Sequence, residues 1–351
     1  MRVDEFDFEL PLEQIAQEPR PRGESRLLVV DRAAGTWREA GFRELPSCLA
    51  PGDLLVGNDS QVFPARLVGR RDPSGGRVEC LLLAREAGKT DTWRTLVHPG
   101  QKLKVGARMV FEDRARAPGI RIVGHIVARD SFGRRSVEFA SSGAATFDAA
   151  VDAIGHVPLP PYISRPDTAA DRERYQTVFA RARGSVAAPT AGLHFDPAIL
   201  DSLAVRGVGL ATVTLHVGYG TFKPVRVEEV EDHVVDPEPY EIPPRTVEAV
   251  RETRAKGGRV IAVGTTTTRA LEAASLGGTF HPGAGRADLF IHPGHTFRTV
   301  DALLTNFHLP RSSLLMLVAA FAGKDLTMAA YRHAVAEGFR FYSYGDGMLI
   351  R

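Results

Sequence analysis

Cysteine is nearly absent from this 351-residue sequence, and long hydrophobic runs are missing. The two cysteines, Cys48 and Cys80, stand far apart, which excludes a disulfide framework and a cysteine-rich zinc site. The longest apolar run covers nine residues, 314–322, far fewer than the roughly 20 that a membrane-spanning helix needs. Residues 1–10 alternate acidic with apolar side chains and lack the apolar core of a signal peptide. These features predict a cytoplasmic protein without a membrane span.

Net charge is also low, at +2, but it is divided unevenly along the chain. Residues 66–150 contain 16 Lys and Arg against 9 Asp and Glu, a net charge of +7, whereas the rest of the chain carries −5. A concentrated basic segment favours a polyanionic partner, because contacts to phosphates release counterions. An arginine-rich surface that is merely solvated has the same composition. Charge alone leaves both interpretations open.

The basic segment also has a structural pattern of its own. Short β-branched and partly alternating runs, separated by Gly, Pro and Asp turns, predict six strands at residues 62–69, 76–84, 93–97, 108–111, 121–128 and 136–139. Six short strands at such spacing predict a small β-barrel. A proline-rich stretch, residues 155–162, follows them and predicts a stiff, extended linker.

From residue 178 onward the pattern changes to alternating helices and strands. Helices are predicted at residues 197–206, 246–256 and 268–274, and strands at 209–216 and 259–263. This alternation predicts an α/β fold with a mostly parallel sheet, whose ligands bind at the carboxyl ends of the strands. The Gly- and Thr-rich turn 264–269 (GTTTTR) lies at such an end, and it matches neither a Walker P-loop nor a dinucleotide-binding turn.

A second candidate site is the loop 184–195 (GSVAAPTAGLHF). Its small residues let the backbone approach a ligand, Pro189 stiffens it, and Thr190 and His194 supply polar atoms. Further stretches of this kind follow at 215–222 (LHVGYGTF), 231–233 (EDH), 305–310 (TNFHLP) and 341–348 (FYSYGDGM). No helical or strand period explains them, so they indicate a binding or catalytic site.

Together these stretches closely resemble the S-adenosylmethionine:tRNA ribosyltransferase-isomerases of queuosine biosynthesis. The resemblance runs end to end, since it includes residues 2–4 (RVD), 8–11 (FELP), 64–67 (PARL), 175–179 (YQTVF) and 344–346 (YGD) as well. It implies that the ribosyl part of S-adenosylmethionine is transferred to a 7-aminomethyl-7-deazaguanine at the wobble position of a tRNA. Adenine and methionine leave, and the product is epoxyqueuosine-tRNA.

The resemblance also implies a mixed α/β main domain formed by both ends of the chain, residues 1–62 and 152–351, with an inserted antiparallel β-barrel, residues 63–151. These limits agree with those drawn from turns and charge. We expect a monomer that uses S-adenosylmethionine as a co-substrate and a precursor-bearing tRNA as its partner, with no metal and no true cofactor. His292 and His295 flank a turn without a third ligand nearby, which is a weak metal motif.

Removing a proton from the carbon beside the sulfonium needs a positioned base, supported by desolvation and fixed dipoles. The imidazoles and carboxylates of the motifs are the candidates for catalysis: His194, His216, Glu231, Asp232, His233, His308 and Asp346. Residues predicted to bind substrate are Thr190, Thr265, Thr266, Arg269, Asn306 and Tyr344. The Arg269 guanidinium suits the methionine carboxylate, and pairing with Glu272 on the next helical turn is the alternative. For each residue alone, a structural role is the competing interpretation.

The basic barrel is expected to orient the anticodon arm of the tRNA while the exposed wobble base enters the α/β site. The residues predicted to contact RNA are Arg70, Arg71, Arg77, Arg134 and Arg135. A competing surface lies at the domain junction, around Arg165, Arg181 and Arg183.

Some positions depart from the usual motifs of the family. Asp236 stands where a histidine often follows the EDH motif, Gln61 stands where Arg or Lys is common, and Thr267 and Thr268 replace Ser-Val before Arg269. Two other functions stay open: an S-adenosylmethionine-dependent tRNA methyltransferase and a non-catalytic tRNA-binding protein. Against a methyltransferase, the sequence has no Gly-rich strand-turn early in the α/β part. Against a binding protein, such a function leaves the polar motifs outside the basic segment unexplained.

Overall fold

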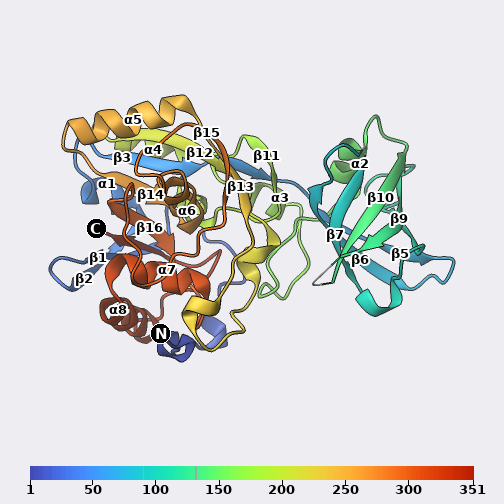
Figure 1. Ribbon diagram of the computed structural model, residues 1–351, viewed down its shortest axis with the longest axis horizontal. Helices are drawn as coiled ribbons and strands as arrows, with labels where there is room; N and C mark the ends of the chain where they lie inside the picture. Colours follow the sequence, from blue (N-terminus) through green and yellow to red (C-terminus); the bar gives the residue numbers. More distant parts are fainter. Residues whose placement is uncertain (90, 131–132) are drawn as a thin grey trace.

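The computed structural model describes residues 1–89, 91–130 and 133–351. Figure 1 shows a larger α/β part that holds both ends of the chain, with a smaller barrel beside it. The larger part is built on a nine-stranded sheet with the order β15-β13-β12-β3-β14-β16-β17-β1-β2. Its strands are β1 (Arg26–Asp31), β2 (Thr36–Gly41), β3 (Leu54–Asn58), β12 (Gly209–Leu215), β13 (Glu238–Ile242), β14 (Val260–Val263), β15 (Gly283–Ala287), β16 (Ala302–Asn306) and β17 (Gly347–Ile350).

The centre of this sheet is parallel, and antiparallel pairs flank it. Strands β12, β3, β14 and β16 are parallel neighbours. Every residue of β3, β14 and β16 is buried, as expected for strands covered on both faces. Strand β13 pairs antiparallel with β12 and β15 at one side, and β17 pairs antiparallel with β16 at the other. The sheet is therefore mixed, and the prediction of a mostly parallel sheet holds only for its centre.

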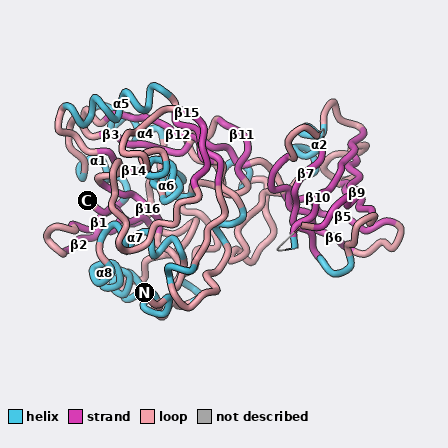
Figure 2. Tube along the Cα trace, viewed as in Figure 1, coloured by secondary structure: helices cyan, strands magenta, loops and turns pink. Residues whose placement is uncertain are grey.

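Alternate strand residues point to opposite faces of the sheet, and helices cover both faces (Figure 2). Leu28 and Val30 of β1 belong to the core under α5, α6, α7 and α8, whereas Leu27 and Val29 belong to the core under α1 and α4. These helices are α1 (Leu45–Cys48), α4 (Pro197–Val205), α5 (Pro244–Ala255), α6 (Thr265–Ala273), α7 (Ser313–Ala322) and α8 (Lys324–Ala336). The α/β fold class is confirmed.

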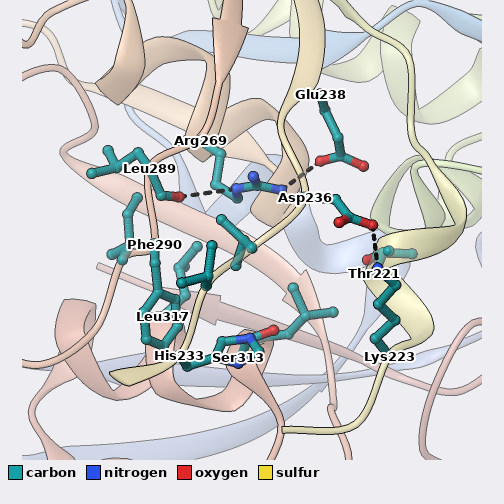
Figure 3. Close-up of a pocket in the computed structure, with 15 residues that line it drawn as sticks. Thr221, Lys223, His233, Asp236, Glu238, Arg269, Leu289, Phe290, Ser313 and Leu317 are labelled. Atoms are coloured by element: carbon teal, nitrogen blue, oxygen red, sulfur yellow. Dashed lines mark hydrogen bonds and ion pairs between the residues drawn. The ribbon is translucent and has the colours of Figure 1, made fainter. Parts of the chain in front are cut away.

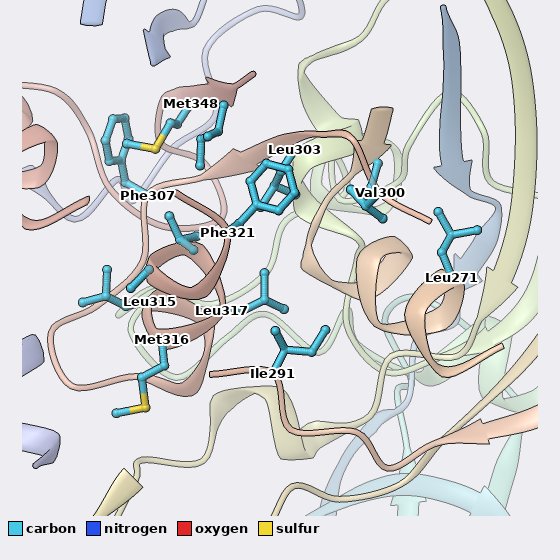
Figure 4. Packing of buried hydrophobic residues seen from close by; sticks show 14 of the residues in the cluster. Leu271, Ile291, Val300, Leu303, Phe307, Leu315, Met316, Leu317, Phe321 and Met348 are labelled. Atoms are coloured by element: carbon cyan, nitrogen blue, oxygen red, sulfur yellow. The ribbon is translucent and has the colours of Figure 1, made fainter. Parts of the chain in front are cut away.

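Helix α7 is apolar on nearly all sides because it is buried in the middle of the larger core. Figure 4 shows its residues Leu315, Leu317 and Phe321 pointing among the side chains of neighbouring segments, including Phe307 and Leu303. Among the described residues no single helix is long and apolar enough to cross a membrane. Only α7 and α8 taken together have the length and the apolar composition of a membrane span, and a bend of 117° separates them.

Six strands close into the barrel, with the order β10-β7-β6-β5-β8-β9 and antiparallel pairing throughout. They are β5 (Arg66–Asp72), β6 (Arg77–Arg85), β7 (Thr92–His98), β8 (Arg108–Glu112), β9 (Arg121–Arg129) and β10 (Arg134–Ser142). The predicted six-stranded barrel is confirmed, although its first strand was placed too early, since Val62 belongs to β4 (Ser60–Val62). Cys80 faces the barrel core, where burial raises the pKa of its thiol to about 12.

The two parts are joined where β4 pairs in parallel with β11 (Ala182–Ser185). Arg66 at the start of β5 also forms a bridge with His156 just after the last segment of the barrel region, so the chain enters and leaves this region at neighbouring points, which agrees with an insertion. Helix α2 (Phe147–Ile154) packs against the barrel core, and its end reaches back to β11 through an ion pair between Asp152 and Arg183, 2.8 Å long. The exact domain limits, 62/63 and 151/152, stay predictions.

The predicted helices and strands of the α/β part are found, with one shift that matters for the site. Helix α6 begins at Thr265, three residues before the predicted start, so the threonine run is its first turn rather than a loop. The hydroxyls of Thr267 and Thr268 donate to the carbonyl oxygens of Val263 and Gly264, four residues earlier. Such bonding lets buried threonines fit a helix despite their low helical propensity.

Candidate active site

The site is set by the parallel centre of the sheet. Because β3, β12, β14 and β16 run in the same direction, their carboxyl ends meet at one edge, where open α/β sheets bind ligands. Asn58 at the end of β3 ties this edge together. Its Oδ1 accepts a hydrogen bond from the Leu215 N–H at 3.0 Å, and its Nδ2 donates to the Leu215 carbonyl oxygen at 2.9 Å.

A cavity lies at this edge, and we name it the edge cavity. Its polar lining comes from six separate segments of the chain: Tyr162, Thr190, Thr221, Thr265, Thr266, Thr305, Asn306, His308, Tyr342 and Ser343. Five of these residues, namely Thr190, Thr265, Thr266, Asn306 and His308, were singled out from sequence. The cavity has the convergent polar groups typical of a small-molecule site.

Asn306, the last residue of β16, makes three hydrogen bonds through its side chain. Its Oδ1 accepts a hydrogen bond from the Thr190 hydroxyl at 3.0 Å. Its Nδ2 donates to His194 Nε2 at 3.1 Å and to the Tyr342 carbonyl oxygen at 3.2 Å. His194 must then carry its proton on Nδ1, which lies 2.9 Å from the Ser25 hydroxyl. The buried imidazole therefore holds the Asn306 amide in place.

His194 itself does not line the edge cavity. Burial lowers its pKa to about 4, with a smaller effect of Arg22 in the same direction, so the ring is neutral at physiological pH. It stacks on Phe42, with ring centroids 4.8 Å apart. These contacts assign His194 to positioning rather than to contact with a ligand in this cavity.

His308 does line the edge cavity, two residues beyond Asn306. Its Nε2 lies 3.0 Å from the Thr305 hydroxyl, and its backbone N–H donates to the Tyr331 hydroxyl at 3.2 Å. Burial lowers the pKa of His308 to about 3, which leaves the imidazole uncharged at neutral pH.

Two tyrosines form an aromatic wall of this cavity, of which Tyr342 belongs to the predicted stretch 341–348 and Tyr162 was not predicted to belong to the site. The rings of Tyr162 and Tyr342 have centroids 3.8 Å apart. Tyr342 has φ at +74°, a conformation that non-glycine residues rarely adopt and that clusters at functional sites. It is held there because its N–H donates to the Phe307 carbonyl oxygen at 3.0 Å. Burial raises the pKa of both phenols, so both stay neutral.

A second cavity adjoins the first, and the two share Thr221 and Leu314. We name it the Arg269 cavity (Figure 3). Arg269 is 11% exposed and donates to the Glu238 carboxylate and to the carbonyl oxygens of Ala287 and Leu289, at 2.7 and 3.3 Å. Burial raises the pKa of Glu238, and the Arg269 charge opposes that shift. Glu238 was not singled out from sequence.

The alternative pairing of Arg269 with Glu272 is wrong. The buried Glu272 carboxylate instead accepts the backbone N–H groups of Arg298, Thr299 and Val300 at 2.8 to 3.0 Å. His295 Nε2 lies 3.6 Å from the same carboxylate. In the described part of the chain, no group of three or more His, Cys, Asp or Glu side chains has the arrangement of a metal site.

The other predicted catalytic residues lie outside the edge cavity. His233 lines the Arg269 cavity and meets Phe290 edge-on, and burial lowers its pKa. His216 packs over Gly184, and burial lowers its pKa as well. Glu231 pairs with the Met1 ammonium at 2.9 Å, and Asp232 beside it is exposed.

Asp346 and Tyr344 hold the C-terminal motif in place. The buried Asp346 carboxylate accepts hydrogen bonds from the Arg20 guanidinium and from the N–H groups of Arg26 and Arg340, each at 2.8 Å. The Tyr344 hydroxyl donates to Asp171 at 3.0 Å. Neither residue lines the edge cavity or the Arg269 cavity, so the structure does not bring them to the predicted substrate.

The predicted RNA-contacting arginines occupy different environments. Arg70 and Arg77 are 45% and 75% exposed, and each pairs with a glutamate of the barrel. Arg71 lies over Gly76 at the β5–β6 turn. Arg134 is 23% exposed and pairs with Asp236 of the α/β part at 2.9 Å.

The predicted RNA contact of Arg135 needs correction. Its side chain is 3% exposed and donates to the carbonyl oxygens of Gly100, Leu103 and Gly133 at 2.9 to 3.2 Å. A buried guanidinium that is committed to backbone acceptors cannot meet RNA phosphates. The prediction that Arg135 contacts RNA is therefore wrong.

Comparison with known proteins agrees with this architecture. Residues 3–350 match the family model described as queuosine biosynthesis protein. Relatives named S-adenosylmethionine:tRNA ribosyltransferase-isomerase include proteins from Moorella thermoacetica and Geobacter sulfurreducens, 49% and 51% identical to this chain over the full length of both chains in each pair. The crystal structure of the S-adenosylmethionine tRNA ribosyltransferase from Thermotoga maritima is similar with a TM-score of 0.56 and 40% identity, covering 99% of this chain and 100% of that one. The chain belongs to the queuosine biosynthesis protein family.

Proposed function

We propose that this protein transfers the ribosyl part of S-adenosylmethionine to 7-aminomethyl-7-deazaguanine at the tRNA wobble position and isomerises it, giving epoxyqueuosine-tRNA, adenine and methionine. Family membership over residues 3–350 is the observation that carries this function. The protein acts as a monomer in the cytoplasm and needs no metal or other cofactor. Residues 1–62 and 152–351 form the catalytic domain, and residues 63–151 form the inserted barrel.

The edge cavity binds the adenosine part of S-adenosylmethionine in this proposal. The aromatic wall of Tyr162 and Tyr342 suits the flat purine. At the start of α6, the N–H groups of Thr265 and Thr266 have no acceptor within the helix, so they are available to ligand oxygens. Asn306, held in a fixed orientation by three partners, completes the polar side of the cavity.

His308 is the general base in this proposal. The reaction needs a proton removed from the carbon beside the sulfonium, and His308 is the predicted catalytic residue that lines the edge cavity. Its pKa of about 3 means that the ring is already unprotonated throughout the neutral pH range. Because His308 itself is buried, the positive charge of a sulfonium beside it is less screened than in water, which favours the loss of a neighbouring proton.

The barrel surface that carries Arg70, Arg71, Arg77 and Arg134 orients the anticodon arm. The net charge of +7 between residues 66 and 150 supports this role, as does the exposure of Arg70 and Arg77. Arg70 and Arg77 each pair with a glutamate near the surface, and a phosphate oxygen can replace such a partner at little cost in free energy. The junction arginines Arg165, Arg181 and Arg183 form the competing surface.

Product analysis tests the function. Purified protein is incubated with S-adenosylmethionine and tRNA that bears the deazaguanine precursor, and the small molecules are separated by chromatography. Free adenine in step with a heavier wobble nucleoside supports the proposal. S-adenosylhomocysteine in place of adenine identifies a methyltransferase, and tRNA binding without any turnover identifies a binding module.

A further inference from the structure

The Arg269 cavity combines charges of both signs with an apolar side. Figure 3 shows Arg269, Glu238, Asp236 and Lys223 around one part of it, and Leu289, Phe290 and Leu317 around another. A ligand that matches this lining carries a positive and a negative group close together on an apolar chain.

The two ion pairs of the cavity differ in how firmly they are held. Arg269 and Glu238 are 11% and 6% exposed, and Arg269 also donates to two backbone carbonyl oxygens, so this pair is held in a fixed position. Lys223 and Asp236 are 39% and 34% exposed, with 2.6 Å between Lys223 Nζ and Asp236 Oδ2. An ion pair this exposed contributes little to stability and exchanges its partners readily.

We propose that the Arg269 cavity is the subsite for the methionine part of S-adenosylmethionine, which rests on the proposed function. The substrate carboxylate pairs with Lys223 and its ammonium group with Asp236, so two new ion pairs replace the pair between these side chains. Leu314 and Leu317 contact the methylene chain. This assignment moves the carboxylate contact from Arg269, whose three nitrogens already donate to Glu238, Ala287 and Leu289, to Lys223.

The position of the cavity relative to the edge cavity supports the assignment. Thr221 and Leu314 line both cavities, so a single ligand can extend from one into the other. S-adenosylmethionine has that form, because one sulfonium joins its adenosine to its amino acid. The proposal also gives a role to Asp236, which stands where the family often has histidine: a carboxylate attracts an ammonium group more strongly than a neutral imidazole does.

Calorimetry with three probes tests the subsite: S-adenosylmethionine, L-methionine, and 5′-methylthioadenosine, which has the adenosine but no amino acid. Asp236→Asn should weaken S-adenosylmethionine and L-methionine by about tenfold or more and leave 5′-methylthioadenosine unchanged. Lys223→Met should show the same pattern. Equal weakening of all three probes, or of none, would overturn the proposal.

Asp236 also pairs with Arg134 of the barrel, so a matched variant is needed. Arg134→Met breaks that pair and keeps the contact between Asp236 and Lys223. It should leave the affinity for S-adenosylmethionine unchanged, and a loss as large as that of Asp236→Asn would show that the effect passes through the barrel, against the proposal. The binding results do not depend on turnover. If the wild-type protein releases no adenine while the probe pattern holds, the function fails and the subsite stands.

Discussion

Replacing Glu238 by glutamine should destabilise the fold far more than breaking an ion pair on the surface. The Glu238–Arg269 pair is 6% and 11% exposed, and loss of one partner leaves a buried guanidinium with only the carbonyl oxygens of Ala287 and Leu289. Removing one partner of a buried pair costs about 3–5 kcal/mol. Glutamine keeps an acceptor for the Gly218 N–H, which Glu238 Oε1 accepts at 2.8 Å, so we expect a value near the lower end, about 3 kcal/mol.

The assay is urea-induced unfolding followed by tryptophan fluorescence. Trp37 lies in β2 of the sheet and Trp93 in β7 of the barrel, so single-tryptophan backgrounds separate the two parts. Glu238→Gln should shift the Trp37 transition. Glu79→Gln is the control, because its pair with Arg77 is 37% and 75% exposed and should contribute less than about 1 kcal/mol. If Glu238→Gln lowered the free energy of unfolding by less than about 1 kcal/mol, the argument that the buried Arg269 guanidinium needs the Glu238 carboxylate would be refuted.

Three further predictions concern the base, the acid limit of stability and the RNA surface. His308→Asn should lower kcat by more than about a hundredfold with nearly unchanged affinity for S-adenosylmethionine, and a near-normal rate would remove His308 as the base. Burial alone would raise the pKa of Asp171, but hydrogen bonds from Arg165, Thr168 and Tyr344 lower this pKa to about 2. The ionised carboxylate therefore stabilises the fold by about 2 kcal/mol above pH 4, and this contribution is lost as the pH falls towards 2. Asp171→Asn should lower the free energy of unfolding at pH 6 and make that free energy depend less on pH between 4 and 2. Arg70→Glu with Arg77→Glu should raise the KM for tRNA and reduce its log–log salt slope by about 0.7–0.9 per lost phosphate contact, whereas an unchanged slope would favour the junction arginines.

The barrel could be predicted from sequence because its signals are local. Each strand is a short β-branched run between turn residues, and all six runs form strands of the closed barrel. The period of two along a strand also explains the neighbouring arginines of β10. Arg135 points inward with Val137, whereas Arg134 points outward to Asp236. Charge composition alone cannot distinguish these two directions.

The candidate site was less predictable, because its contacts join residues that lie far apart in the chain. Arg269 meets Glu238, which is 31 positions away, rather than Glu272 on its own helix. His194 looked like a catalytic residue by its motif, and only the fold shows that it holds Asn306, 112 positions away. The four threonines read as a loop because threonine is a poor helix former, whereas burial and bonds to carbonyl oxygens four residues earlier make them helical.

The most direct test of the proposed function follows the carbon atoms of S-adenosylmethionine. Two samples, one labelled in the ribosyl carbons and one in the methyl group, are incubated with the protein and tRNA that bears the deazaguanine precursor. We expect the ribosyl label in the tRNA wobble nucleoside, the methyl label in free methionine, and one adenine released per modified tRNA. Methyl label in the tRNA with S-adenosylhomocysteine as the by-product would contradict the ribosyl transfer.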